Sequence, residues 1–226
     1  MKMPNVVDLF CGAGGLSLGF RQAGFNPVMA FDFDRHACAT YAANLGNHVH
    51  QVDLSRVVPS DFAGEILDFT GEVDVVAGGP PCQGWSIQRR GDGIDERNDL
   101  TIQFSEIATA INPKAIVMEN VPTLFGKRGA KHLAIVEEKL EASGYRVYKK
   151  ILDASSFGVP QSRRRAVLVA IKREFGSTFE FPEPSHASGN LVTVRQAIGD
   201  LPPPPKDGSE HPDYPNHKIV KVSAAN

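Results

Sequence analysis

The chain has 226 residues, of which 42% are hydrophobic and 22% charged, and its net charge is −2 at pH 7. Such a chain buries a core and folds as one domain, with room for an appendage. Its cysteines, Cys11, Cys38 and Cys82, form no CxxC pair, which argues against a disulfide framework or a metal site. No apolar run approaches the roughly 20 residues of a membrane helix, and no signal peptide precedes the first strand pattern. We therefore expect a cytoplasmic protein, whose near-neutral charge neither indicates nor excludes nucleic acid.

Up to about residue 173, short β-branched apolar runs alternate with amphipathic helical patterns. The apolar runs predict buried strands, parallel to one another, over 6–10, 28–31, 73–77, 115–118 and 166–171, with a third, short strand over 50–52. Apolar residues at three- and four-residue spacing predict helices over 16–23, 35–44, 100–111 and 131–142. This alternation is typical of an α/β, doubly wound, mostly parallel Rossmann-like sheet, whose ligands bind beyond the carboxyl ends of its strands.

After Arg173 the composition changes, because prolines interrupt every periodic pattern. One short helix is predicted over 193–201. Long structureless segments are uncommon in compact domains. We therefore expect residues 1–173 to form the functional domain and residues 174–226 to form a Pro-rich linker towards a further part of the protein.

The first motif is a strand that runs into a glycine-rich turn and then a helix, DLFCGAGGL at 8–16. Gly12 and Gly14 let the backbone approach a ligand and place it at a helix N-terminus. The GxGxxG dinucleotide pattern fails, because Ser17 stands where its last glycine is needed. The alternative is an ordinary strand-to-helix turn.

Two acids and an aromatic residue follow the next strands. Asp32 comes about 20 residues after the turn, where an acid can hold ribose hydroxyls. Phe33 beside it can face an adenine ring, and Asp53 can accept from an adenine amino group. The alternative is that these are ordinary surface residues. Together with the turn, they predict a site for a nucleoside-bearing cofactor.

The second motif, GGPPCQGWS at 78–86, directly follows a predicted strand. Cys82 lies there at the mouth of the sheet, between prolines and glycines that suit a nucleophile better than a core residue. For Cys11 and Cys38 we expect the commoner state of a small buried thiol.

The third motif, ENV at 119–121, ends another strand. Adjacent strand ends converge on one crevice, so Glu119 can face the same pocket as Cys82 and donate a proton there. The alternative is a strand-end acid that caps the next element.

The fourth motif, QSRRR at 161–165, leads into a strand. Alternate residues of an extended segment share a face, so Arg163 and Arg165 are predicted to point together and Arg164 away. Paired guanidinium groups suit phosphates or a base carbonyl. The alternative is a solvated basic run.

These four motifs, in this order, resemble the cytosine-5 DNA methyltransferase family over residues 5 to 172. The pair PCQ at 81–83 and ENV at 119–121 carries most of the resemblance. It implies a Rossmann-like domain that binds S-adenosylmethionine and releases S-adenosylhomocysteine. The residues implied to line the cofactor pocket are Phe10, Gly12, Gly14, Asp32, Phe33, Asp53, Pro80 and Leu100.

The resemblance also implies the catalytic residues. Cys82 would be the nucleophile that adds to cytosine C6, and Glu119 the acid at N3. Arg165 would contact the base carbonyl, and Arg163 would support the catalytic loop. The implied reaction is methylation of cytosine C5 in double-stranded DNA, on a base flipped out of the duplex, within a bacterial restriction-modification system.

The family's target-recognition region and last motifs are not visible in this sequence. The chain is therefore expected to be truncated, part of a longer protein, or one subunit of a split enzyme, with a C-terminal recognition segment or a second subunit as partner. Three other functions stay open: a tRNA cytosine-5 methyltransferase, a non-catalytic relative that acts as an interaction module, and a nicotinamide-dependent dehydrogenase. The intact set of Cys82, Glu119 and Arg165 speaks against the second, and Ser17 against the third.

Overall fold

The computed structural model describes residues 2–81, 99–176, 178–186 and 189–219. The chain divides into two compact units. The larger, here called the sheet unit, takes Met1–Ala154 and Arg163–Glu183, and the smaller takes Ser155–Ser162 and Pro184–Asn226. The predicted boundary at residue 173 stays a prediction.

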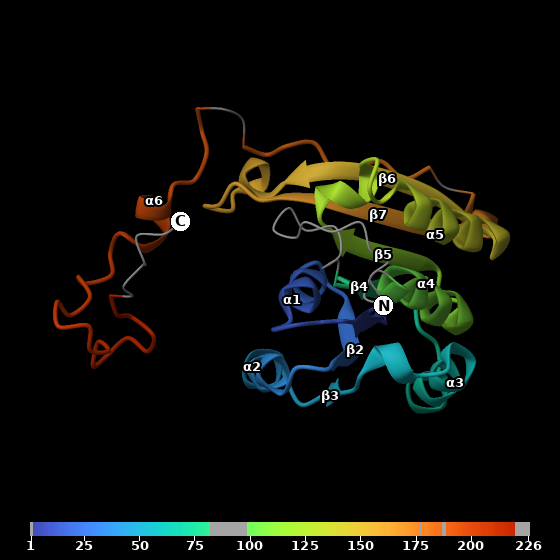
Figure 1. The fold of residues 1–226 in the computed structure, drawn as a ribbon, viewed down its shortest axis with the longest axis horizontal. Coiled ribbons are helices and arrows are strands. Elements are labelled where there is room, and N and C mark those ends of the chain that lie inside the picture. The colour runs from blue at the N-terminus through green and yellow to red at the C-terminus, as the bar shows by residue number, and fades with distance from the viewer. Residues whose placement is uncertain (1, 82–98, 177, 187–188, 220–226) are drawn as a thin grey trace. The chain divides into compact units, whose positions relative to one another are not determined.

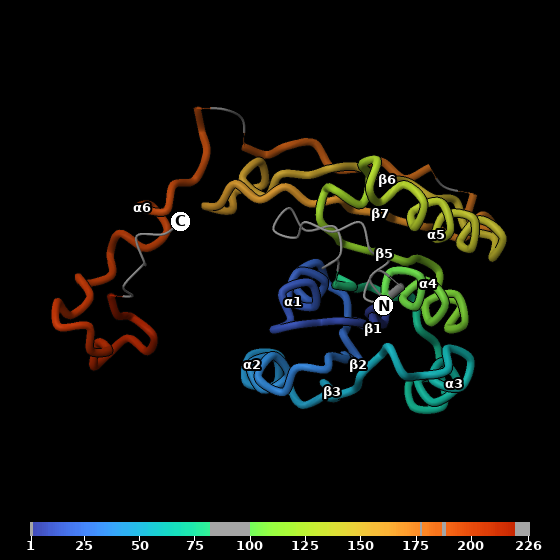
Figure 2. Tube along the Cα trace, viewed as in Figure 1, coloured from blue at the N-terminus to red at the C-terminus, as the bar shows by residue number. Residues whose placement is uncertain are grey.

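In the described residues of the sheet unit, seven strands form one sheet in the order β3-β2-β1-β4-β5-β7-β6. The strand order reverses direction between β1 and β4, and in open α/β sheets ligands bind in the crevice outside the carboxyl ends at such a point. In Figure 2 the colours pass from blue at the β3 edge to yellow and orange at the β6–β7 edge. The strands are β1 Asn5–Leu9, β2 Asn26–Asp32, β3 Val49–Gln51, β4 Val75–Gly78, β5 Ala115–Asn120, β6 Tyr145–Asp153 and β7 Arg164–Lys172.

Helices cover both faces of this sheet, and its central strands are therefore buried and mostly apolar. The strands β1 and β4 are buried along their whole length. Of the described helices, α1 Gly15–Gln22 and α2 Arg35–Leu45 lie on one face (Figure 1). The other face carries α3 Pro59–Thr70, α4 Asp99–Ile111 and α5 Ala130–Ala142. The main core lies on the three-helix face, where Phe104 and Ile107 of α4 pack with Ile66 of α3 and Leu140 of α5.

The predicted doubly wound, mostly parallel sheet is confirmed, and each of the six predicted strands is present within a few residues. One direction was wrong: 166–171 was expected to be parallel, but β7 is antiparallel to both β5 and β6. A parallel strand needs a crossover of a dozen or more residues, usually helical, whereas residues 154–163 between β6 and β7 form only a short connection. Two elements were not predicted from the sequence, α3 and β6.

Within the described residues of the smaller unit, Val194–Ile198 forms a short α-helix, α6. Thr193 and Gln196 form a capping box that starts it, in agreement with the helix predicted at 193–201. Further along, His211 and Tyr214 form an isolated β-bridge, and their rings lie edge to face. The many prolines of this unit allow little other regular structure.

Among the described residues, no helix is both long and apolar enough to cross a membrane. The same part of the chain holds no group of three or more His, Cys, Asp or Glu side chains placed to bind a metal ion.

Candidate active site

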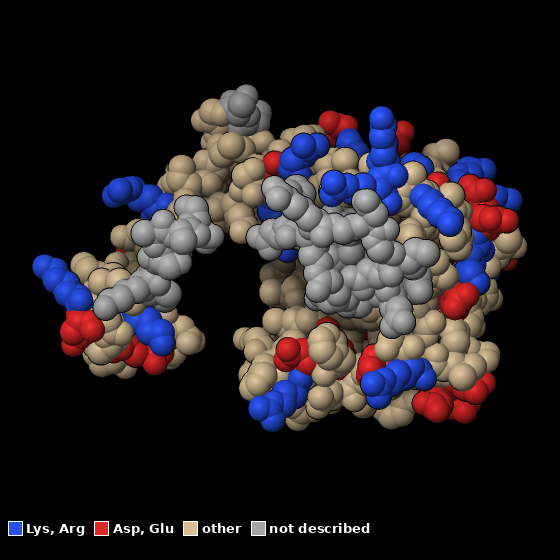
Figure 3. All heavy atoms as spheres, viewed as in Figure 1, with Lys and Arg blue, Asp and Glu red and all other residues tan. Residues whose placement is uncertain are grey.

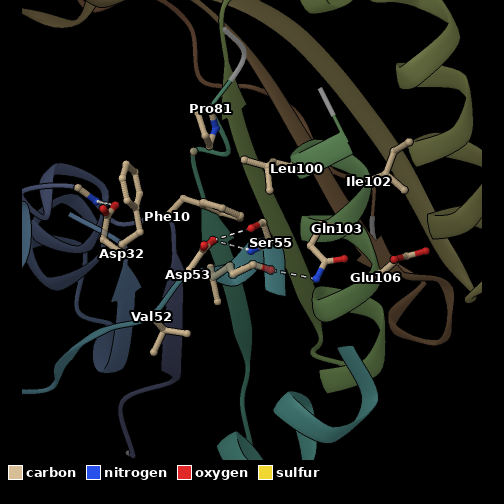
Figure 4. Close-up of a pocket in the computed structure, with 14 residues that line it drawn as sticks. Phe10, Asp32, Val52, Asp53, Ser55, Pro81, Leu100, Ile102, Gln103 and Glu106 are labelled. Carbon is tan, nitrogen blue, oxygen red and sulfur yellow. Dashed lines mark hydrogen bonds between the residues drawn. The ribbon is translucent and has the colours of Figure 1, made fainter. Parts of the chain in front are cut away.

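A cavity of about 830 Å³ lies at the carboxyl ends of the strands. That volume is in the range of sites for drug-sized ligands and cofactors. Figure 4 shows Phe10, Asp32 and Asp53 reaching it from the ends of β1, β2 and the turn after β3, with α4 opposite. The lining residues are Phe10, Gly12, Asp32, Phe33, Val52, Asp53, Leu54, Ser55, Gly79, Pro81, Leu100, Ile102, Gln103 and Glu106.

The two glycines of the turn after β1 have different tasks. Gly12 has a φ of +54° and open space where a Cβ would lie, so its backbone borders the cavity directly. Gly14 has a φ of +92° and is buried, and a Cβ there would lie 2.3 Å from Leu45 Cδ1 and 2.7 Å from Tyr41 Cδ2. Gly14 is therefore needed for packing against α2, and it does not line the cavity.

Asp32 connects the end of β2 to the glycine turn. Its Oδ2 accepts a 2.8 Å hydrogen bond from the Gly12 backbone N–H, and its Oδ1 accepts one of 2.9 Å from the Asp34 N–H. Each carboxylate oxygen keeps a lone pair that can accept from a ligand hydroxyl. Next to it, the Phe33 ring borders the cavity with 66% of its surface exposed, which offers an aromatic face for stacking.

Asp53 begins the short helix η1, Leu54–Arg56. Its Oδ1 accepts from Ser55 Oγ at 2.6 Å and from Ser55 N–H at 3.1 Å, and its Oδ2 lies 3.0 Å from Arg56 Nε. The hydrogen bond from the Ser55 hydroxyl is the main cause that lowers the pKa of this carboxyl, although burial opposes it. Asp53 is therefore an ionised acceptor at the cavity wall.

The helix α4 forms one wall of the cavity, of which only Leu100 was predicted from the sequence. Gln103 Nε2 donates 2.9 Å hydrogen bonds to the carbonyls of Leu54 and Val57, which fixes α4 against η1. Glu106 pairs with Lys139 of α5 at 2.9 Å. The three-residue steps from Leu100 to Gln103 and Glu106 on a predicted helix were the signal that could have found this wall.

Glu119 and Arg165 form an ion pair at the ends of two neighbouring antiparallel strands. Arg165 Nε lies 2.5 Å from Glu119 Oε1, and both side chains are partly exposed. Arg165 Nη1 also donates to the Arg164 carbonyl at 2.8 Å, which fixes the guanidinium. The second carboxylate oxygen, Oε2, faces Gly79, where a Cβ would lie 3.2 Å from it.

Asn120 joins the Glu119 strand to the turn after β4. It is buried, and its Nδ2 donates a 3.0 Å hydrogen bond to the Pro80 carbonyl. Its Oδ1 accepts from the Val121 N–H at 2.8 Å. The turn that leads into Cys82 is thereby fixed to the strand that carries Glu119, although Cys82 itself lies outside the described residues.

Six of the eight predicted cofactor residues border the cavity: Phe10, Gly12, Asp32, Phe33, Asp53 and Leu100. Gly14 does not, and Gly79 and Pro81 line the cavity where Pro80 was expected. Arg163 is exposed and precedes β7. Its backbone N–H donates to Asp153 Oδ1 at 3.1 Å, and its supporting role stays a prediction.

Basic side chains gather on one part of the sheet unit. Figure 3 shows Lys and Arg over the region of α5, β6 and β7. Exposed residues of that region are Lys127, Arg128, Lys131, Arg146 and Lys150. A net charge near zero therefore does not describe the local field of this surface.

Comparison with known proteins places this geometry in a family. The model of the C-5 cytosine-specific DNA methylase family matches residues 4–222. The Type II methyltransferase M1.HphI of Haemophilus parahaemolyticus is 43% identical over 200 residues, which cover 87% of this chain and 52% of the relative. M.AgeI of Thalassovita gelatinovora is 38% identical, with 93% and 54% covered. M.AquIA of Picosynechococcus is 32% identical, with 88% and 89% covered.

Solved structures agree with this assignment. A structure from E. coli, described as that of a DNA modification methyltransferase encoded within a prophage, superposes with a TM-score of 0.76 at 30% identity, covering 88% of this chain and 55% of that one. The S. pombe Dnmt2 methyltransferase shares the fold, with a TM-score of 0.62 at 20% identity, covering 93% and 58%. The chain spans about half the length of M1.HphI and M.AgeI. It belongs to the C-5 cytosine-specific DNA methylase family.

Proposed function

We propose that this chain supplies the cofactor-binding and catalytic part of an S-adenosylmethionine-dependent DNA cytosine-5 methyltransferase. The observation that carries the proposal is the pair of Glu119 and Arg165 beside the turn that leads to Cys82, next to a cavity with nucleoside-binding acceptors. Family membership supports the same reaction class.

The cavity suits S-adenosylmethionine by the chemistry of its wall. Asp32 has free lone pairs for the ribose hydroxyls, Asp53 can accept from the adenine amino group, and Phe33 offers a ring for stacking. The open space at Gly12 lets the backbone approach the methionine part. The cofactor supplies an electrophilic methyl group and leaves as S-adenosylhomocysteine.

The catalytic residues make cytosine C5 nucleophilic. The Cys82 thiolate forms a bond to C6 while Glu119 passes a proton taken up from water to N3, so that the ring electrons move towards C5. After C5 takes up the methyl group, a base removes the C5 proton, and the electrons of that C–H bond expel Cys82. Arg165 binds Oε1 of Glu119, which leaves Oε2 for contact with the cytosine ring. We also assign to Arg165 the contact with the carbonyl of the cytosine.

Double-stranded DNA is the proposed substrate. Inside a duplex the target ring is stacked and paired, so the base must be flipped into the site, at a cost of a few kcal/mol. The family description names DNA, and the relatives of 32–43% identity described above are Type II methyltransferases. These descriptions favour DNA over tRNA and favour a restriction-modification enzyme over a non-catalytic module.

The test is methyl transfer from labelled S-adenosylmethionine to duplex DNA and to tRNA, offered separately. A parallel assay uses DNA with 5-fluorocytosine, in which fluorine at C5 blocks the final elimination and traps the adduct. We expect label in DNA and a covalent adduct, both lost in Cys82→Ser while the cofactor still binds. Label in tRNA alone would assign the other substrate, and an adduct that persists in Cys82→Ser would exclude Cys82 as the nucleophile.

A further inference from the structure

Asp8, at the centre of β1, is a buried acid that the reaction proposed above does not use. Only 1% of its surface is exposed. Its Oδ2 accepts a 2.6 Å hydrogen bond from Ser17 Oγ on α1. The Ser17 backbone N–H also acts to lower the pKa of this carboxyl. Its Oδ1 is buried and has no hydrogen-bond partner within the described part of the chain. A buried acid with so few partners calls for a reason, because an ionised carboxylate is costly to remove from water.

Ser17 is the first link of a hydrogen-bonded chain that leads away from Asp8. Tyr41 Oη lies 3.0 Å from Ser17 Oγ, and His48 Nε2 lies 3.0 Å from Tyr41 Oη. Ser17 and Tyr41 are fully buried. His48 lines a separate cavity of about 260 Å³, together with Arg21. The hydrogen-bonded series Asp8–Ser17–Tyr41–His48 therefore connects the core beneath the glycine turn with the wall of a second cavity.

Each hydroxyl carries one proton, so the hydrogen bonds of this series can all point in either of two directions. When Asp8 is ionised, Ser17 donates to it, Tyr41 donates to Ser17, and His48 donates from a protonated Nε2. When Asp8 holds a proton on Oδ2, every link reverses, and His48 Nε2 accepts with its proton on Nδ1. The protonation of Asp8 and the tautomer of His48 are thus linked.

The same residues fix the glycine turn. Gly14 is the N-cap of α1 and has no side chain to cap the helix. The Asp8 carboxyl instead contacts the first turn of α1, through its hydrogen bond from Ser17 Oγ. The Tyr41 ring packs where a Cβ on Gly14 would lie. An ionised carboxylate at a helix N-terminus is also favoured by the helix dipole.

We propose that Asp8 is a positioning residue for the glycine turn. Its ionised form, which accepts the hydrogen bond from the Ser17 hydroxyl, holds Gly12 and Gly14 in the geometry that binds the cofactor. Protonation of Oδ2 reverses the hydrogen-bonded series, so that Asp8 no longer accepts from Ser17 Oγ, and weakens cofactor binding. The inference rests on the proposed function for the identity of the ligand.

The groups that face Asp8 are Cys11 in the turn, Asp32 at the end of β2, and Tyr41 on α2; β4, on its other side, has no titratable side chain. Burial, opposed by the Ser17 hydrogen bonds and helped by the charge of Asp32, raises the pKa of Asp8 to about 7. Burial also raises the pKa of Cys11 far above its usual range and that of Tyr41 to about 12.

His48 is the last member of the hydrogen-bonded series. Burial lowers its pKa, with smaller contributions from Arg21 and His50. His48 is therefore neutral near pH 7, which is the form that can exchange one tautomer for the other. Asp8 is left as the member of the hydrogen-bonded chain that changes charge near neutrality.

The first test measures cofactor affinity of the 226-residue chain between about pH 8 and about pH 6. We expect affinity for both S-adenosylmethionine and S-adenosylhomocysteine to fall about tenfold at the acid end, a typical coupling between two linked events. In the Asp8→Asn variant this fall should be absent, so that the affinity varies with pH only through the ligand's own titrating groups. A fall confined to S-adenosylmethionine would show attraction of the sulfonium charge and would overturn the positioning role.

The second test follows Asp8 and His48, the two ends of the hydrogen-bonded series, by NMR. Linkage requires that a tenfold effect on affinity lower the pKa of the Asp8 carboxyl by about one unit when the ligand binds. The His48 ring nitrogens should change tautomer with the midpoint of Asp8, and Tyr41→Phe should abolish that change while it keeps the ring packed under Gly14. A His48 tautomer that ignores Asp8 would overturn the inference. Absence of ligand binding at every pH would instead contradict the proposed function.

Discussion

The backbone N–H of Gly12 donates a 2.8 Å hydrogen bond to Oδ2 of Asp32. One acid thus fixes the glycine turn of β1 to the end of β2, and it does so at the cavity wall. The carboxylate cannot rotate freely, so its remaining lone pairs face the cavity in a defined direction. Such preorganisation lowers the entropic cost of holding a ligand.

Replacing Asp32 by Ala should weaken cofactor binding by about 1–3 kcal/mol, because the change removes an acceptor of a buried hydrogen bond and frees the Gly12 turn. Titration calorimetry would measure the loss. The matched control is Asp34→Ala, two residues on. Asp34 caps α2 through the N–H groups of His36 and Ala37, so its loss should cost about 1 kcal/mol of stability and leave the affinity unchanged. Equal affinities of wild type and Asp32→Ala would mean that the ribose binds elsewhere.

Replacing Arg165 by Lys should slow methyl transfer about 100-fold with little change in cofactor affinity. A lysine ammonium cannot hold Glu119 and the Arg164 carbonyl together, as the guanidinium does. Single-turnover kinetics with the 5-fluorocytosine adduct as readout would isolate the step. The control is Arg164→Lys, since the Arg164 side chain is exposed and only its carbonyl takes part. Should both variants lose activity equally, the effect would come from the strand and not from the Glu119 pair.

Replacing Gly14 by Ala should destabilise the fold by about 2 kcal/mol or more. The new Cβ would meet Leu45 and Tyr41 at less than 3 Å and would sit on a backbone with a φ of +92°. Gly15→Ala is the comparison, because Gly15 begins α1 with open space around it and should gain up to about 1 kcal/mol. Chemical denaturation measures both. Similar unfolding free energies for the two variants would contradict the packing role of Gly14.

The fold could be predicted because the central strands are short apolar runs with helical patterns between them. The predictions that failed concern single elements, namely α3, β6 and the direction of β7. The pattern of α3 follows Pro59 and was not recognised, and β6 mixes Lys149 and Lys150 with apolar residues, as an edge strand does. The direction of β7 depends on a short connection, which hydropathy does not report.

The positions of Asp32 and Asp53 at the cavity wall were predictable, because strand ends converge there. The candidate site was not predictable where function depends on packing. Gly14 belongs to the glycine motif but packs against α2. Asp8 stands in an apolar strand, where the acid itself was a signal, yet nothing in the pattern named Ser17 as its partner.

Asp8 also sets a pH dependence of stability that runs opposite to that of cofactor binding. Burial raises its pKa from 3.8 to about 7, so the folded state favours the protonated acid. The stabilisation is therefore complete below the unfolded value, near 4, and is lost as the pH rises through about 7.

The difference in unfolding free energy between wild type and Asp8→Asn should change across that window by up to roughly 4 kcal/mol, since each pKa unit is worth about 1.4 kcal/mol. Urea denaturation at several pH values measures it, and all other titrating groups cancel in the difference. A purely structural acid would make binding follow stability. A positioning role instead makes the affinity for both S-adenosylmethionine and S-adenosylhomocysteine rise with pH while stability falls. A difference that does not vary with pH would show that Asp8 is ionised in the folded protein throughout.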